Sequence, residues 1–88
     1  MEATIKCLIL RENCAIVSQV EEVDVELGEP NCKLIKPCEV HKNGDSIYLT
    51  PWLSEYTSQD TMLISSDSVL TIIDPNKNIL TKYIDIIS

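Results

Sequence analysis

The chain has 88 residues, of which 44% are apolar, and carries a formal net charge of −7. This length is enough for one compact domain (residues 1–88) and too short for two, and a domain so small gains stability from self-association. Nucleic-acid affinity depends largely on Lys and Arg, so seven basic residues against fourteen acidic ones argue against nonspecific DNA binding.

The composition favours a β-rich protein with an aliphatic core. There is no Phe, one Trp and three Tyr, so Ile, Leu and Val must fill the interior, and β-branched residues favour strands. The first ten residues begin with an acid and contain too short an apolar stretch for a signal peptide. We therefore expect a cytoplasmic protein without a membrane partner.

Two strands are predicted in the first third of the chain. One is predicted over residues 3–10, where the odd-numbered apolar side chains share one face and the far end of the strand should be well buried. The next covers residues 14–27, and its apolar positions change from even to odd numbers near Glu21 and Glu22. Such a phase change predicts a bulge or a sharp bend at that point.

The middle of the chain predicts a hairpin. A strand over residues 33–41 contains Pro37, which cannot donate to a strand ladder and demands an edge or an irregularity. Asn43-Gly44 is a strong turn signal, and a further strand follows over residues 46–53. In that last strand Trp52 is predicted to be a core or interface anchor.

The chain closes with two short strands and a helix. Residues 61–65 and 68–73, joined by a tight turn at Ser66 and Asp67, predict a final hairpin. Asp74-Pro75 is typical of a helix start, so a helix over 75–87 should cover the apolar end of the sheet. Its predicted apolar stripe consists of Ile79, Leu80, Tyr83, Ile84 and Ile87.

No pattern of a metal site or of catalysis is complete. Cys32, Cys38 and His41 offer three ligands but no fourth at familiar zinc spacing, and the acidic run over residues 21–29 lacks the spacing of a calcium loop. Catalysis would have to rest on a thiol of Cys14 or Cys38 near His41. Reduced, buried cysteines explain the same residues, so we expect no enzyme, no metal and no cofactor.

One segment resembles a known family. In ISSDSVLTI, the residues Ile64, Val69 and Ile72 keep the three aliphatic positions of a segment that Sm-like (LSm) proteins carry between their last two strands. The chain is also similar to a group of Sm-like proteins encoded by tailed phages of cyanobacteria. The shared stretches are KLIKPCEV (Lys33 to Val40), IYLTPWLSEY (Ile47 to Tyr56) and a closing helix after an acid-Pro pair.

This resemblance implies a small, strongly bent five-stranded SH3-like (Sm-like) barrel, mostly β, with strands over about residues 3–73 and the C-terminal helix. Sm proteins form rings in which the fourth strand of one subunit pairs with the fifth strand of its neighbour. A cyclic homo-oligomer of about five to seven subunits is therefore expected. The residues expected at its interface are Leu63, Ile64, Val69, Leu70, Thr71 and Ile72.

The sequence departs from the family at the base-binding residues. Ser65 and Ser66 stand where RNA-binding Sm proteins have Arg and Gly, and no Asp-x-x-x-Asn occurs over residues 23–31. The resemblance leaves Ser65, Ser66 and Asp67 as candidate RNA contacts. The hypothesis favoured here is an assembly or protein-interaction scaffold with a basic protein partner, in an infected host cell if the protein is phage-encoded. An RNA-binding ring with a diverged pocket is the alternative.

Overall fold

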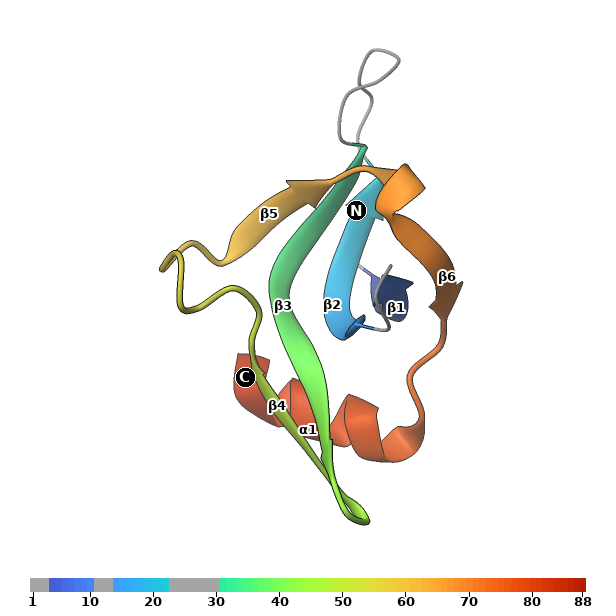
Figure 1. Cartoon of the computed structure of the whole chain (residues 1–88), viewed down its shortest axis with the longest axis vertical. Coiled ribbons are helices and arrows are strands. Elements are labelled where there is room, and N and C mark those ends of the chain that lie inside the picture. The colour runs from blue at the N-terminus through green and yellow to red at the C-terminus, as the bar shows by residue number, and fades with distance from the viewer. Residues whose placement is uncertain (1–3, 11–13, 23–30) are drawn as a thin grey trace.

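The computed structural model describes residues 4–10, 14–22 and 31–88 (Figure 1). Residues 23–27 of the strand that was predicted over 14–27 lie outside these residues, as does most of the acidic run over 21–29. The elements in chain order are β1 (Thr4–Leu10), β2 (Cys14–Glu22), β3 (Cys32–Asn43), β4 (Ser46–Pro51), β5 (Thr61–Ile64), the 3-10 helix η2 (Ser66–Ser68), β6 (Val69–Ile73) and α1 (Lys77–Ile87).

The strands form one antiparallel sheet in the order β4-β3-β2-β1-β6, with β5 beside β3. This confirms the expectation of a mostly β fold with a C-terminal helix. The described part has six strands, the number of segments that the residue patterns predict, whereas the resemblance implied five. β3 has two partners along its length. Residues 32–35 pair with β5, and residues 38–43 pair with β4. Within the described residues, no pairing joins β6 to β4 or β5.

The predicted final hairpin is wrong. β5 pairs with β3 and β6 pairs with β1, so the two strands are not partners of each other. Figure 1 shows how η2 carries the chain from one strand to the other across one end of the sheet. The physical reason is packing, because Ile64 of β5 and Val69 of β6 both pack against the same apolar core.

The irregularity in β3 lies at Lys36 and Pro37. On β2, Val17 pairs with Cys38 and Gln19 with Ile35, so Lys36 and Pro37 together stand opposite Ser18. Lys36 has a left-handed backbone, with φ 53°, which is typical of the first residue of one kind of bulge. The irregularity demanded by Pro37 is thereby confirmed.

The bulge that was predicted near Glu21 and Glu22 is not found at those residues. Glu21 pairs with Lys33 and Glu22 with Cys32 in regular register, up to the end of the described strand. The alternation of side chains between the two faces changes on the neighbouring strand β3 instead, at Lys36 and Pro37.

The bulge divides the core into two. Leu34, before the bulge, packs in a first cluster with Leu8, Leu10 and Ile16. Cys38, after the bulge, packs in a second cluster with Val17 and Tyr83 of α1. Both residues have even numbers, yet they face opposite sides of the sheet, because the extra residue at the bulge reverses the alternation.

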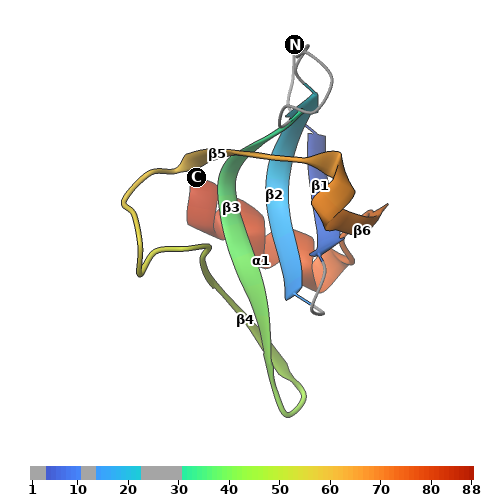
Figure 2. The same cartoon turned by 45° about the horizontal axis from the view of Figure 1, so that its top comes forward.

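Both faces of β1 are used, most fully at its far end, which agrees with the well-buried end predicted for this strand. Leu8 and Leu10 belong to the first cluster, whereas Ile5 packs against the second. The physical reason is that α1 covers one side of the sheet, while β5, η2 and β6 enclose the other (Figure 2).

Helix α1 is held to the bulge by Tyr83, whose side chain is fully buried. Its hydroxyl accepts a hydrogen bond from the backbone N–H of Gln19 at 3.1 Å. The same hydroxyl lies 3.0 Å from the carbonyl oxygen of Ile35 and 2.9 Å from that of Lys36, and shares its hydrogen between them. Ser18, also buried, shares its hydroxyl hydrogen between the carbonyl oxygen of Gln19 at 2.8 Å and that of Ile35 at 3.2 Å. Polar groups freed by the bulge are thus satisfied by side chains.

The helix begins two residues later than predicted. Asn76, and not Asp74, is the N-cap, and its Oδ1 accepts from the backbone N–H of Ile79 at 2.9 Å. Asp74 instead pairs with Lys6 of β1 at 2.5 Å. The predicted apolar stripe is also narrower than expected, because Ile84 is 45% exposed.

The predicted hairpin between residues 33 and 53 is confirmed, with Asn43 opposite Ser46. Its two-residue turn is Gly44-Asp45, and Gly44 has φ 63°, which glycine adopts readily. The second strand of this hairpin ends earlier than predicted, at Pro51. The backbone N–H of Trp52 donates to the carbonyl oxygen of Pro37 at 2.9 Å.

Candidate functional site

Three strands of the sheet have an unpaired edge in the described part of the chain, namely β4, β5 and β6. β5 pairs with β3 alone and β6 with β1 alone, so each presents one row of backbone N–H and C=O groups away from its partner. Such edges are templates for strand pairing between chains.

The outer surface of β5 and β6 is apolar. Leu70 is the extra residue of a second irregularity, since Ile9 pairs with Thr71 and Leu10 with Val69. Its side chain projects into solvent as a result. The exposed apolar residues on these two strands are Leu63 (55% exposed), Leu70 (59%), Ile72 (49%) and Ile73 (48%).

The structure divides the six residues predicted at a subunit interface into two groups. Leu63, Leu70, Thr71 and Ile72 are exposed, whereas Ile64 and Val69 are half-buried and pack against the first core cluster. Ile73, which was not predicted, belongs with the exposed group. Its exposure follows from its place at the end of β6, which the pattern of the segment does not reveal.

The predicted RNA contacts lie at η2. Ser65 Oγ accepts from the backbone N–H of Asp67 at 3.2 Å, and the Ser65 carbonyl accepts from the N–H of Ser68 at 3.0 Å. Ser65 and Ser68 border a cavity of about 350 Å³ together with Leu10, Trp52 and Ile64. No Lys or Arg is among the described residues that line it. The side chain of Ser66 is not among those that the structure describes.

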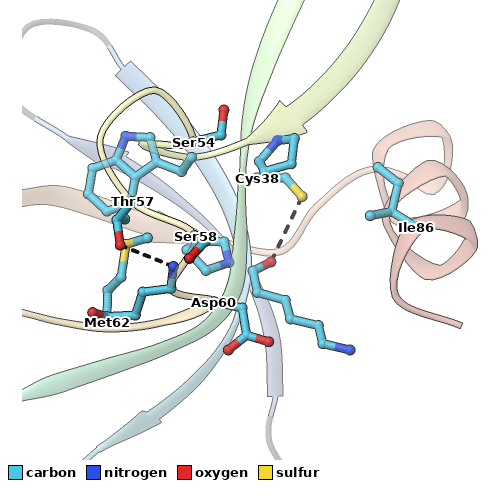
Figure 3. Close-up of a pocket in the computed structure, with 12 residues that line it drawn as sticks. Cys38, Ser54, Thr57, Ser58, Asp60, Met62 and Ile86 are labelled. Carbon is cyan, nitrogen blue, oxygen red and sulfur yellow. Dashed lines mark hydrogen bonds between the residues drawn. The ribbon is translucent and has the colours of Figure 1, made fainter.

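A second cavity, of about 290 Å³, opens between β3, the loop after β4 and the end of α1 (Figure 3). Cys38, Trp52, Met62 and Ile86 give it apolar walls, and hydroxyl-bearing residues of the loop form its polar rim. Figure 3 shows Cys38 donating to the carbonyl oxygen of Lys36, a contact of 3.8 Å.

A third cleft, of about 450 Å³, has a different character. Three of the chain's four aromatic side chains and its one His line it. Its described lining residues are Glu39, His41, Tyr48, Thr50, Pro51, Trp52, Leu53, Ser54, Glu55 and Tyr56. We call this the aromatic cleft. Sequence reasoning missed it, and the available signal was the concentration of aromatic residues over positions 41–56.

The register of β3 and β4 builds the floor of the aromatic cleft. Glu39 lies opposite Thr50 and His41 opposite Tyr48, so these four side chains share the face of the hairpin turned away from α1. The rings of His41 and Tyr48 stack at 4.8 Å between centroids, with an interplanar angle of 14°. His41 Nε2 lies 2.7 Å from Thr50 Oγ1, which fixes the plane of the imidazole.

The cysteines and the histidine do not gather into a metal site. Cys38 belongs to the core cluster under α1, whereas His41 points to the opposite face of β3. Among the described residues, no three His, Cys, Asp or Glu side chains are placed to hold an ion. Burial raises the pKa of the thiols of Cys7, Cys32 and Cys38 above the ordinary value, and nearby Glu22 adds to the effect at Cys32. Such thiols are poor nucleophiles at neutral pH.

Fold and surface together define a small antiparallel β domain closed by a C-terminal helix, with apolar strand edges and an aromatic cleft. The chain belongs to the family described as "Family of unknown function (DUF6561)", whose match covers residues 3–88. A comparison with curated proteins gives no match. In the part of the chain that the structure describes, no helix has the length and apolarity needed to cross a membrane.

Proposed function

We propose that this chain forms a ring-shaped homo-oligomer and acts as an assembly or protein-interaction scaffold. The observation that carries the proposal is the pair of unpaired edges on β5 and β6, each bordered by exposed apolar side chains. The two edges belong to different strands, so pairing β5 of one copy with β6 of the next is a head-to-tail contact. Contacts of this type close into rings when the rotation between neighbours allows it.

A half-open SH3-like (Sm-like) barrel is the fold that we propose for such a subunit. Three features support it: the meander order of the strands, the two partners of β3 along its length, and the passage of the chain through η2 from β5 to β6. The similarity to Sm-like phage proteins noted above agrees with this arrangement and supports a phage origin.

Burial adds an energetic argument. Removing one exposed Leu or Ile side chain from water contributes about 1.5–3 kcal/mol when the burial is complete. Leu63, Leu70 and Ile72 together could therefore supply several kcal/mol to each contact between neighbours. A domain of this size has little stability of its own to spare, which makes such burial useful.

The native mass in solution tests the proposal. Light scattering or native mass spectrometry should give a cyclic oligomer of about five to seven subunits. Leu70→Lys, which places a charge on the contact, should shift the mass to that of the monomer. Ile84→Lys on α1 is the matched control, because its side chain is similarly exposed on another element, and it should leave the mass unchanged. A wild-type monomer at high protein concentration refutes the ring.

An RNA-binding ring is the second candidate, and one observation favours it. The cavity beside Ser65 and Ser68 includes Trp52, whose ring could stack on a base. The charge of the chain opposes this role, since no basic residue among those described lines the cavity. Binding of U-rich or A-rich RNA by micromolar protein at low salt would support the RNA role, and failure to bind under those conditions would remove it.

A further inference from the structure

The aromatic cleft combines flat rings with negative charge. His41 and Tyr48 form its stacked floor, and Trp52 and Tyr56 lie on the chain that leaves β4. Tyr48 is 49% exposed and Tyr56 is 83% exposed, so both present ring surface to solvent. Exposed aromatic faces attract cations, because the ring quadrupole is negative above and below the plane.

Two carboxylates border the same cleft. Glu39 comes from β3 and Glu55 from the segment after β4. Among the described residues neither glutamate forms an ion pair, in contrast to Glu21, which is paired with Lys33. One Glu39 oxygen lies 3.9 Å from Cys14 Sγ. No Lys or Arg is among the described residues that line the cleft, so its charge is not neutralised from within.

We propose that the aromatic cleft binds an arginine side chain of a basic protein partner. A guanidinium group is planar, so it can stack on the His41–Tyr48 pair, and its N–H groups form a fork that suits a carboxylate. The two glutamates repel the phosphates of a nucleic acid, which makes a protein side chain the better match. The inference rests on the proposed protein-interaction role and gives that role a site, but it does not require a ring.

Intrinsic fluorescence gives a local readout, because Trp52 is the chain's one tryptophan and lines the cleft. The probe is a short unstructured peptide with three Arg residues and blocked ends. The control peptide carries citrulline, a neutral isostere, at the same positions. The Arg peptide should change the Trp52 emission saturably, more weakly at high salt, and the citrulline peptide should not.

Two single substitutions locate the binding. Glu55→Gln and Tyr56→Ala should each weaken the affinity for the Arg peptide about three- to fivefold, the range expected for one solvent-exposed charge or cation–π contact. Both residues lie at the surface, so the fold should survive the changes. Asp85→Asn on α1 is the matched control for charge, and it should leave the affinity unchanged.

The outcomes separate this inference from the ring. No saturable response to the Arg peptide at millimolar concentration overturns it, whatever the native mass. Equal responses to the Arg and citrulline peptides, or equal weakening by Glu55→Gln and Asp85→Asn, also overturn it. Saturation of the Trp52 signal by RNA but not by the Arg peptide would overturn the arginine site, and it would fit RNA in the cavity beside Ser65 and Ser68, which Trp52 also lines. A monomeric protein that binds the Arg peptide in the cleft supports the site and refutes the ring alone.

Discussion

Removal of one hydroxyl group tests how α1 is held to the sheet. Tyr83→Phe keeps the buried ring, so it opens no large cavity, but it deletes the hydrogen bonds to the backbone of Gln19, Ile35 and Lys36. The carbonyl of Ile35 keeps Ser18 as a donor. The backbone N–H of Gln19 loses the acceptor that faces it at the bulge.

The expected loss of stability follows from the hydrogen bonds that the hydroxyl makes. The hydroxyl has one hydrogen, so it makes the equivalent of one donated and one accepted hydrogen bond, worth about 1 kcal/mol each. Leaving the Gln19 N–H without this acceptor in a buried position adds a desolvation penalty of about 1 kcal/mol. Tyr83→Phe should therefore lower the free energy of unfolding by about 2–3 kcal/mol, a large share for a small domain.

Urea unfolding measures this loss, with Trp52 fluorescence and far-UV circular dichroism as two probes. Protein concentration must be equal for all samples, because self-association changes the apparent stability. Tyr56→Phe is the matched control, since the side chain of Tyr56 is 83% exposed, and its effect should stay within about 0.3 kcal/mol. A loss below about 0.5 kcal/mol for Tyr83→Phe would refute the docking of α1 through this hydroxyl.

The pH dependence gives a second check on Tyr83. Burial raises the pKa of its hydroxyl above the ordinary value of 10.0. The folded state then holds a proton that the unfolded state releases, so this contribution to stability is complete below about pH 10 and is lost as the pH rises further. Tyr83→Phe should show a shallower decline of stability above pH 10 than the wild type. Identical slopes would count against a buried hydroxyl.

Three more predictions concern the backbone and the thiols. Lys36→Gly should raise the free energy of unfolding, measured in urea, by about 0.5–1 kcal/mol, because glycine adopts the left-handed backbone at φ 53° without strain. A clear loss of stability would contradict a left-handed residue at the bulge. Asn76→Ala should lower the free energy of unfolding by about 1 kcal/mol, because it removes the N-cap of α1. Asp74→Ala should lower it by less than about 0.5 kcal/mol, because it removes only an exposed ion pair with Lys6. A larger loss for Asp74→Ala than for Asn76→Ala would indicate that Asp74 is the cap. The three buried cysteines, whose folded pKa values are raised, should make stability fall as the pH rises above about 8.5, and rapid alkylation of these thiols by iodoacetamide in the folded protein would show that they are not protected.

Features set by neighbouring residues could be predicted from the sequence. The hairpin at Asn43-Gly44 and the closing helix both depend on local turn and capping chemistry, and both are present. Pro37 predicted an irregularity, because a residue without a backbone N–H cannot donate to a regular strand ladder. The left-handed backbone of Lys36 could not be predicted, since that conformation is expected at glycine and not at lysine.

Features set by distant residues could not be predicted. The partners of β5 and β6 depend on which apolar core each strand can complete, and a short turn between them favoured the wrong choice. The aromatic cleft depends on the register that places His41 against Tyr48, and on a loop that carries Tyr56 back to them. The interface itself stays a prediction, which the resemblance placed at the residues flanking η2. The exposure of a single side chain such as Leu70 could not be predicted, because it follows from an irregularity in pairing.

The bulge at Lys36 and Pro37 decides where the chain can tolerate a change of length. Deleting one residue there would pair β3 one to one with β2, and it would leave Cys38 opposite Val17 under α1 and His41 on the face of the aromatic cleft, because two residues now stand opposite Ser18 alone. An insertion at the Gly44-Asp45 tip would lengthen a solvent-exposed turn and leave both faces intact. Homologous chains should therefore vary in length at the tip of the β3–β4 hairpin, and across positions 34 to 38 they should differ by no more than the one extra residue of the bulge.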